Sequence, residues 1–434
     1  MEFTLWADMR DRARVLYLSP SGELGGAELS LLDVLASLPE TLPGVERHLV
    51  VPETGPLSTR ASALGVTVHY LPFPVSIATM GDSAIGLSGN LRSTVTMVRY
   101  GLPAAAASMQ YGRRLGSFVE RLRPAVIHSN GMKMHLLGYL SGIGSAAPLI
   151  WHVRDFVSTR VLMAKALRRS ARSARMAIAI SEAIGRDFRD TIKSLPVEVI
   201  ANAIDVDHFS PGFADGSILD QIAGFPALKA ATLRVGLIAT YARWKGQELF
   251  LQAAAKVREL RPDLPLRYYI VGGPIYKTAG SQYSANELWE QIDRLGLKQC
   301  CALIPFQDDT RSVYRALDVI VHASTRPEPF GRTIVEAMAC QRPVIVARDG
   351  GASELFTEDY DAVGFVPNDC HQLACAIIGL VDSRARRDRI AAAARHTAVS
   401  RYSRQRLATQ ISTVYRRLLS AGEMALPELT GTNP

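Results

Sequence analysis

The chain has 434 residues, enough for two or three domains with a hydrophobic core each. Hydrophobic residues make up 48% of it and the mean hydropathy is +0.08, yet no run of about 18 consecutive apolar residues occurs, which excludes a membrane-spanning helix. None of the five cysteines has a CxxC or Cys/His metal spacing, and the first residues are rich in charge. We therefore expect reduced thiols, no metal site, no signal peptide and a cytoplasmic location.

The formal net charge of +8 is concentrated in one part of the chain. Residues 92–175 contain fourteen Lys or Arg and two acids, a net charge of +12, so the remainder is mildly acidic. A patch this one-sided favours contact with the phosphates of lipid or nucleic acid, although a solvated basic face is the simpler interpretation.

The first predicted unit is a strand, a glycine-containing loop and a helix. Residues 14–19 read as a strand, and an amphipathic helix runs to about Leu38. Gly25 and Gly26 stand at the junction, where they would let the backbone come close to a ligand phosphate. Glycine pairs also occur in ordinary turns, so this loop alone indicates little.

Further strands follow in the first half of the chain, separated by helical patterns. This alternation predicts a parallel, doubly wound α/β sheet with ligands at the carboxyl ends of its strands. Between the third and fourth strands, residues 72–117 have a looser pattern that suggests an insertion or helices. The predicted strands cover residues 48–51, 66–71, 124–131, 148–155, 176–180 and 197–200.

Polar residues stand at several of these strand ends, namely His128, Asn130, His152, Arg154 and Asn202. A single histidine in such a place is often structural. Two histidines on successive strand ends of one sheet favour a binding role.

A linker at residues 209–229, with several Pro and Gly, precedes a second strand, loop and helix at residues 233–260. Lys245 and Gly246 stand at the mouth of the helix. The lysine can reach a pyrophosphate there as a point charge. Later strands are predicted at residues 267–273, 302–309, 343–347 and 363–366.

Two carboxylates follow a buried strand at residues 317–322. Pro327, Pro329 and Gly331 predict a rigid loop around Glu328. Residues 332–340 favour a helix, which would put Glu336 near its first turn. Free backbone N–H groups and a positive helix dipole would then lie beside two acids, an arrangement that suits a phosphorylated sugar. The plainer interpretation is a helix start where the dipole favours acids.

This run resembles the Glu-x7-Glu signature of retaining nucleotide-sugar glycosyltransferases with the GT-B fold, the family 4-like enzymes called glycosyl transferases group 1. The resemblance covers residues 15–419, most strongly residues 235–354. It implies an α/β protein with two Rossmann-like doubly wound domains facing across a cleft. The implied parts are an acceptor-binding domain at 1–208, a linker at 209–232, a nucleotide-sugar-binding domain at 233–404, and a C-terminal helix and tail at 405–434 that could pack back on the first domain.

The same resemblance implies the site residues. His152, Glu328 and Lys245 would be catalytic, with His152 beside the sugar and the donor phosphate. The Gly25–Gly26 loop, His128 and Asn130 would face the acceptor or the phosphates. The remaining donor-binding positions would be Arg243, Pro329, Phe330, Gly331, Arg332, Thr333 and Glu336.

The sequence departs from the family pattern at two positions. Ala203 stands where a glycine is usual, in the run Asn202 to Asp205. Thr240 stands where the family has a phosphate-binding arginine, and Arg243 is the candidate to replace it. The anion-binding role is therefore firmer for Lys245.

The implied reaction moves a sugar, of hexosyl or N-acetylhexosaminyl type, from a UDP- or GDP-sugar to a glycan or lipid-linked acceptor with retention of configuration. A role in cell-envelope or polysaccharide biosynthesis is expected. Retention can proceed through a carboxylate nucleophile, but the family favours a front-face mechanism in which the diphosphate helps to deprotonate the acceptor. Glu328 would bind sugar hydroxyls and Glu336 ribose, with no cofactor and no metal.

Four other classes of protein are alternatives. A sugar-nucleotide 2-epimerase shares the architecture but would lack the Glu328 and Glu336 loop. A dehydrogenase would need GxGxxG followed by an acid about 20 residues later, which no strand end provides. A nucleic-acid binder would interleave aromatics with cations, and residues 160–175 contain none. A non-catalytic nucleotide-sugar-binding protein remains open because of Thr240.

Apolar residues and cations alternate within residues 156–169. That mixture suits a helix lying on an anionic membrane surface, peripheral to the inner face of the plasma membrane. The alternative is that the apolar residues pack in the N-terminal core while the arginines are solvated.

Overall fold

The computed structural model describes residues 13–74, 93–226, 232–274 and 280–423. The chain forms two compact units. Unit 1 combines Met1–Ala203 with Arg404–Pro434, and unit 2 is the continuous stretch Ile204–Ser403. Unit 1 therefore takes its last helix from the far end of the sequence.

A seven-stranded sheet forms the centre of unit 1, with the order β3-β2-β1-β4-β5-β6-β7 and every pairing parallel. Its central strands are nearly continuous apolar runs, as expected where helices cover both faces of a sheet. The strands are β1 (Arg14–Leu18), β2 (Glu46–Val51), β3 (Thr67–Tyr70), β4 (Val126–Asn130), β5 (Leu149–Val153), β6 (Met176–Ala179) and β7 (Val197–Val199).

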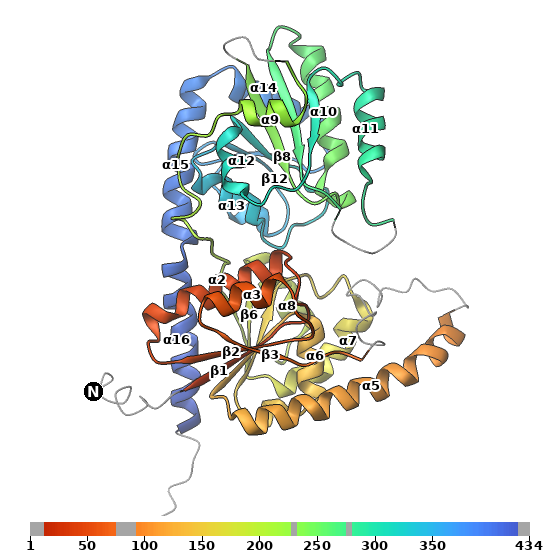
Figure 1. Cartoon of the computed structure of the whole chain (residues 1–434), viewed down its shortest axis with the longest axis vertical. Helices are drawn as coiled ribbons and strands as arrows, with labels where there is room; N and C mark the ends of the chain where they lie inside the picture. Colours follow the sequence, from red (N-terminus) through yellow and green to blue (C-terminus); the bar gives the residue numbers. More distant parts are fainter. Residues whose placement is uncertain (1–12, 75–92, 227–231, 275–279, 424–434) are drawn as a thin grey trace, which may run out of the picture. The chain divides into compact units, whose positions relative to one another are not determined.

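Helices pack around this sheet, and the longest, α5, is prominent in Figure 1. The C-terminal helix α16 lies against α2, where Arg404 donates to the buried Asp33 at 2.8 Å. Leu407 and Ile411 of α16 are fully buried in the core of unit 1. The helices are α2 (Gly26–Thr41), α3 (Pro56–Ala63), α5 (Ser93–Leu122), α6 (Met132–Leu140), α7 (Val161–Ser170), α8 (Glu182–Thr191) and α16 (Arg404–Glu423).

Unit 2 contains a six-stranded parallel sheet with the order β10-β9-β8-β11-β12-β13. This order repeats that of the first six strands of unit 1. The strands are β8 (Leu233–Ile238), β9 (Leu266–Val271), β10 (Cys301–Ile304), β11 (Val319–His322), β12 (Val344–Ala347) and β13 (Val363–Phe365).

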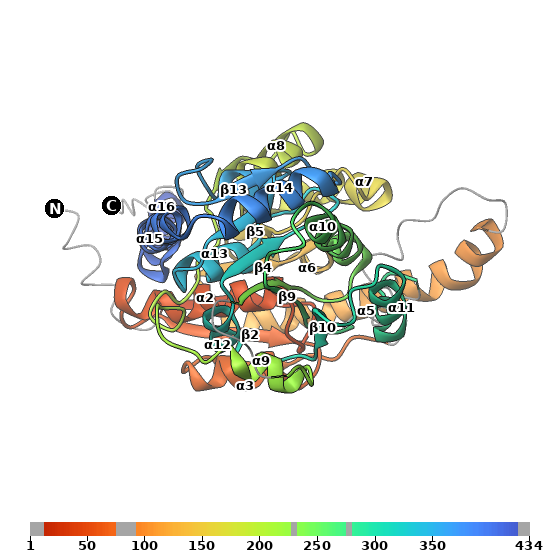
Figure 2. The same ribbon diagram turned by 90° about the horizontal axis from the view of Figure 1, so that it is seen from above.

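The helices of unit 2 flank its sheet, and α10 and α14 lie side by side (Figure 2). The predicted linker at 209–229 contains a short helix, α9, which sequence patterns did not indicate. The helices are α9 (Ser217–Ile222), α10 (Gln247–Leu260), α11 (Ala285–Arg294), α12 (Thr310–Ala316), α13 (Arg332–Ala339), α14 (Cys370–Val381) and α15 (Arg384–Tyr402).

Each sheet reverses its strand order once, between β1 and β4 in unit 1 and between β8 and β11 in unit 2. Open α/β sheets bind ligands outside the carboxyl ends of their strands at such a switch point. In unit 2 the two loops at this point touch. Gly246 has φ +81°, and a Cβ on it would lie 1.9 Å from the carbonyl oxygen of Ala323. Only glycine fits there, so the close approach of the loops is built into the sequence.

The predicted insertion at 72–117 is resolved in part. Residues 75–92 lie outside the described residues, and the remainder belongs mainly to α5. Within the described ranges, no helix is long and apolar enough to cross a membrane. All five cysteines are free thiols.

Candidate active site

Lys245 and Glu328 meet at the switch point of unit 2. Lys245 ends a short 3-10 helix (Arg243–Lys245) after β8, and Glu328 lies in the loop after β11. The Lys245 Nζ is 2.7 Å from the Glu328 Oε2. The Ser324 hydroxyl donates to the same oxygen at 2.8 Å, and the His322 Nε2 lies 3.4 Å from it. Two residues predicted to act on one ligand are therefore in direct contact.

The environment keeps Glu328 ionised. Burial by itself raises the pKa of this carboxyl, but the Lys245 charge and the His322 hydrogen bond outweigh that effect and hold the pKa well below its usual range. A carboxylate of this kind accepts hydrogen bonds and does not serve as a proton donor near neutral pH.

The loop that carries Glu328 is fixed by its backbone. The Gly351 N–H donates to the Glu328 carbonyl at 2.7 Å, and Glu328 forms a parallel bridge with Gly350. Gly350 has φ +59°, and a Cβ there would lie 2.5 Å from the Glu328 carbonyl oxygen. Gly331, with φ +101°, then begins α13 at Arg332. The structure thus gives the predicted loop and helix start.

Glu336 lies near the start of α13. It is the fifth residue of the helix, directly after the first turn, close to the predicted position. The helix starts at Arg332 because Gly331 can adopt the positive φ of its N-cap. Glu336 is 7% exposed. Its Oε2 accepts from the Tyr314 hydroxyl at 2.9 Å, and its Oε1 from the Arg332 Nη2 at 3.1 Å.

Arg243 is held away from Lys245. Its Nη2 lies 2.6 Å from the Glu287 Oε1, and its guanidinium stacks 4.3 Å from the centre of the Tyr283 ring. The Thr240 hydroxyl, at the position of the missing arginine, is buried and has no partner among the described residues. The Arg243 side chain therefore contacts α11 and the segment before it, and its donor-binding role stays a prediction.

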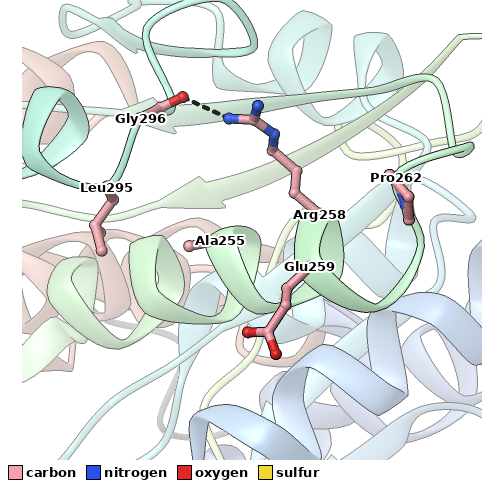
Figure 3. A pocket seen from close by; sticks show the side chains of 6 residues that line it. All are labelled: Ala255, Arg258, Glu259, Pro262, Leu295 and Gly296. Carbon is pink, nitrogen blue, oxygen red and sulfur yellow. Dashed lines mark hydrogen bonds between the residues drawn. The ribbon is translucent and has the colours of Figure 1, made fainter.

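Unit 2 also has hollows that do not include the Lys245–Glu328 pair. One of about 380 Å³ is lined by Arg258 and Gly296, where the Arg258 Nη1 donates to the Gly296 carbonyl at 2.5 Å (Figure 3). Its helical wall is the C-terminal half of α10. Because α10 returns from the carboxyl end of β8, that half lies toward the opposite edge of the sheet. We therefore do not assign it to the donor. Its other lining residues are Ala255, Glu259, Pro262 and Leu295.

In unit 1, the five polar residues predicted at strand ends form one hydrogen-bonded network. The His128 Nε2 lies 2.8 Å from the His152 Nδ1, since β4 and β5 pair with Asn130 opposite His152. Arg154 donates to the His152 Nδ1 at 3.3 Å, to the Asn202 Oδ1 at 2.9 Å, and from its Nε to the Asn130 Oδ1.

Both histidines of this network are neutral near pH 7. Burial, with a smaller contribution from Arg154, lowers the pKa of His128 to about 3. Burial and the charge of Arg154 also lower the pKa of His152 well below its ordinary value. His152 is 1% exposed, and its Nε2 has no partner in the part of the chain that the structure describes. That nitrogen and the Asn130 Nδ2, which also has no partner among the described residues, are the polar atoms of the network left for a ligand.

The predicted glycine loop opens α2. Gly25 is the N-cap, and its N–H donates to the Glu28 carboxylate at 3.1 Å. A Cβ at Gly25 would lie 2.9 Å from that carboxylate, whereas one at Gly26 would meet no heavy atom within 4 Å. Gly25 is thus explained by helix capping and Gly26 by an open approach to the backbone.

Across the described residues, no group of three or more His, Cys, Asp or Glu side chains is arranged to hold a metal ion. Sequence reasoning missed His322, Ser324 and Tyr314. His322 ends β11, so the strand-end rule that found His128 could have found it. Nothing in the local sequence marks Ser324 or Tyr314.

Two Rossmann-type units with the same strand order, each with polar side chains at its switch point, define the class of GT-B glycosyltransferases. The family models agree. Residues 24–208 match Glycosyltransferase Family 4, and residues 228–397 match Glycosyl transferases group 1. The chain belongs to these glycosyltransferases.

Known relatives lie in the same class. A D-inositol 3-phosphate glycosyltransferase from Corynebacterium urealyticum is 30% identical over 227 residues, 51% of this chain and 51% of the relative. One from Rhodococcus erythropolis is 31% identical over 158 residues, 36% of this chain and 34% of the relative. The matched region thus spans about half or less of these curated relatives.

Solved structures share the fold over nearly the whole chain. Anabaena HepE, solved in complex with UDP and glucose, has a TM-score of 0.73 at 24% identity, covering 93% of this chain and 99% of HepE. Sucrose-phosphate synthase from Thermosynechococcus elongatus has a TM-score of 0.74 at 17% identity, covering 94% of this chain and all of that chain. At these identities the likeness defines the fold alone.

Proposed function

We propose that this glycosyltransferase moves a hexosyl or N-acetylhexosaminyl group from a UDP- or GDP-sugar to a glycan or lipid-linked acceptor, with retention of anomeric configuration. The observation that carries the proposal is the Lys245–Glu328 pair at the switch point of unit 2, beside the N-terminus of α13. A cation, an anion and helix N–H groups together suit a ligand with both phosphates and hydroxyls. The UDP and glucose bound by HepE have this chemistry.

In the proposed reaction, the bond between the anomeric carbon and the diphosphate breaks while a bond to the acceptor oxygen forms on the same face. The acceptor proton passes to the departing diphosphate. Negative charge grows on that leaving group, and Lys245 together with the N–H groups of α13 would stabilise it. Loss of one such preorganised group typically costs about 3 kcal/mol, roughly a hundredfold in rate.

Glu328 is suited to bind sugar hydroxyls. The three donors around it converge on Oε2, and no donor among the described residues contacts Oε1. An ionised carboxylate oxygen with free lone pairs accepts hydroxyl protons strongly. Glu336 would bind the ribose in the same way, with Tyr314 and Arg332 fixing its orientation. His152 would position the sugar through its Nε2.

We further propose that the reaction needs neither metal nor cofactor, because Lys245 and the α13 N-terminus supply the positive potential that a metal would provide. Turnover that persists in excess chelator would support this. Turnover restored only by added Mg²⁺ or Mn²⁺ would overturn it.

The function is tested by incubating the full chain with UDP- and GDP-sugars, with and without short glycan or lipid-linked acceptors. Release of the nucleoside diphosphate together with a product of retained configuration supports the proposal. Appearance of the C2 epimer would indicate the epimerase alternative. Tight binding of the nucleotide sugar without turnover on any acceptor would indicate a non-catalytic binding protein.

We also propose a peripheral contact of α7 with an anionic membrane at the cytoplasmic face, in a cell-envelope or polysaccharide pathway. In the structure, the apolar residues of this segment fall into a buried set and an exposed set. Val157, Met163 and Leu167 are buried in unit 1, as the alternative interpretation expected. Val161 and Leu162, at the start of α7, are 63% and 48% exposed.

Cations accompany the exposed pair on α7. Lys165 and Arg169 are exposed on the same helix, whereas the Arg168 Nε donates to the Thr191 carbonyl at 2.8 Å. Exposed apolar side chains flanked by cations favour an anionic bilayer surface. Each basic residue near such a surface contributes about 1 kcal/mol.

A further inference from the structure

The polar network of unit 1 continues from its two histidines into the C-terminal helix. The Tyr415 hydroxyl of α16 lies 2.7 Å from the His128 Nδ1 and 3.2 Å from the Tyr17 hydroxyl of β1. Tyr17, Tyr415 and His128 are all buried. The contacts therefore form one chain from Tyr17 through Tyr415 and His128 to His152, and its last atom is the His152 Nε2.

The protons of this chain can be placed by counting donors. Arg154 has only N–H groups, so its contact with the His152 Nδ1 needs a lone pair on that nitrogen. A neutral His152 then carries its proton on Nε2. The His128 Nε2, 2.8 Å from the same Nδ1, must carry a proton in order to donate.

The same reasoning places the hydroxyl protons of the two tyrosines. With its proton on Nε2, a neutral His128 has a lone pair on Nδ1, so Tyr415 must donate across the 2.7 Å contact. Tyr415 has a single hydroxyl proton, so in this order it cannot also donate across its 3.2 Å contact with the Tyr17 oxygen, and the Tyr17 hydroxyl turns to become the donor there. The reverse order would place a proton on the His152 Nδ1, pointing at the Arg154 N–H. Because that clash is buried beside a guanidinium, it favours the first order, in which Arg154 and His128 share the His152 Nδ1 lone pair.

We propose that Tyr415 is a positioning residue for glycosyl transfer. By donating to His128, it fixes the proton arrangement of the histidine pair, so that His152 offers an N–H donor to a hydroxyl oxygen of the sugar. The naming of the sugar rests on the proposed function, whereas the proton arrangement does not. His152 would thus orient the substrate as a hydrogen-bond donor and would not accept a proton from it.

The arrangement is measured by NMR of the full chain with ¹⁵N-labelled histidine, which distinguishes the two neutral tautomers and the imidazolium. Variants at His128 and His152 assign the two rings among the nine histidines. We expect both rings to be neutral with the proton on Nε2 at pH 7. A proton on the Nδ1 of either ring, or an imidazolium, would overturn the proposal. This measurement needs no donor or acceptor, so its failure is distinct from failure of the proposed function.

Two tyrosine variants isolate the role of Tyr415. Tyr415→Phe removes the only hydroxyl proton that His128 receives in this arrangement, so the His128 signals should shift toward a mixture of tautomers. Tyr17→Phe removes a neighbouring hydroxyl of the same chain but leaves the Tyr415 proton in place, so the His128 signals should stay as in the wild type. Unchanged His128 signals in Tyr415→Phe, or equal changes in both variants, would remove the positioning role.

The kinetic consequence is a separate readout. Loss of one hydrogen bond of typical strength should lower kcat of Tyr415→Phe about fivefold, with little change in the KM for the nucleotide sugar. A purely structural role would instead lower the amount of folded protein while kcat per folded molecule stays constant. If Tyr415→Phe fails to fold, the tautomers of the wild type still decide the proton arrangement.

Discussion

Lys245 and Glu328 are 83 positions apart in the sequence, and their side chains meet with Nζ 2.7 Å from Oε2. The cation proposed to hold the diphosphate and the carboxylate proposed to hold the sugar thus form one electrostatic unit. The Lys245 charge favours the ionised form of Glu328, so a substitution of the lysine also changes the carboxylate. Single variants at Lys245 and Glu328 must therefore be interpreted together with the double variant.

Lys245→Ala should lower turnover about a hundredfold, because the charge that stabilises the leaving group is lost. It should also lower the melting temperature, since a largely buried Glu328 carboxylate is left without its cation. The double variant Lys245→Ala with Glu328→Gln should recover stability but not turnover. Lys256→Ala, an exposed lysine of α10 paired with Glu259, is the matched control. Normal turnover in Lys245→Ala would remove this residue from the site.

Glu336→Gln should raise the KM for the nucleotide sugar about tenfold, because one charge-assisted hydrogen bond to ribose becomes neutral. Asp220→Asn is a closely matched control. Asp220 is also buried and bound to a tyrosine and an arginine, Tyr269 and Arg234, but it belongs to α9, away from the switch point. Both variants should lose stability in thermal unfolding. An equal effect of the two on KM would mean that Glu336 is structural.

The stability of the protein should depend on Glu328 in acid. Its pKa is depressed on folding from an ordinary value of 4.5. Its contribution to the free energy of unfolding is therefore complete above that value and is lost as the pH falls toward the depressed pKa. Glu328→Gln should accordingly lose less melting temperature than the wild type as the pH is lowered from about 5 to about 2. Glu259→Gln, at an exposed site, should follow the wild type. Parallel curves for Glu328→Gln and the wild type would contradict the assignment.

His152→Ala should lower sugar transfer far more than it weakens binding of the free nucleoside diphosphate, because the proposed contact is to the sugar. Steady-state kinetics and calorimetric titration with UDP and GDP measure the two quantities. His135→Ala is the control, since His135 is also buried in unit 1 but stacks on Trp151. Equal losses of transfer and nucleotide binding in His152→Ala would point to folding alone.

Sedimentation with lipid vesicles tests the α7 surface. Binding should require anionic lipid and fall as salt rises. It should weaken when Lys165 and Arg169 are changed to Glu and when Val161 and Leu162 are changed to Ser. Arg168 is left unchanged because it holds the Thr191 carbonyl. Equal binding to neutral and anionic vesicles, or none to either, would favour a soluble acceptor.

The order of strands and helices could be predicted from sequence because parallel sheets are built from short apolar runs separated by helical patterns. The strand-end rule likewise predicted that His128 and His152 lie close together, as the structure shows. The start of α13 at Arg332 could likewise be predicted from Gly331, whose positive φ suits the N-cap, and this places Glu336 near the first turn. The family group-1 and family-4 matches confirm the predicted class.

Other features depend on pairings that no local pattern contains. Arg243 is predicted to bind the donor, yet its side chain in the structure contacts Glu287 of α11 and Tyr283, which lies just before that helix. Tyr415 is 287 positions from His128. Contacts of this kind follow from tertiary packing, and a single sequence carries no sign of them.

The packing of α16 against unit 1 has a consequence for folding during synthesis on the ribosome. Residues up to Ala203 cannot complete their core when they emerge, because Leu407, Ile411 and Tyr415 have not yet been translated. Unit 2 is continuous in sequence and can finish folding first, which reverses the usual order in which domains mature. Until the last helix leaves the exit tunnel, the growing chain exposes the apolar face of α2. The same face would be bare in any fragment that stops at residue 403.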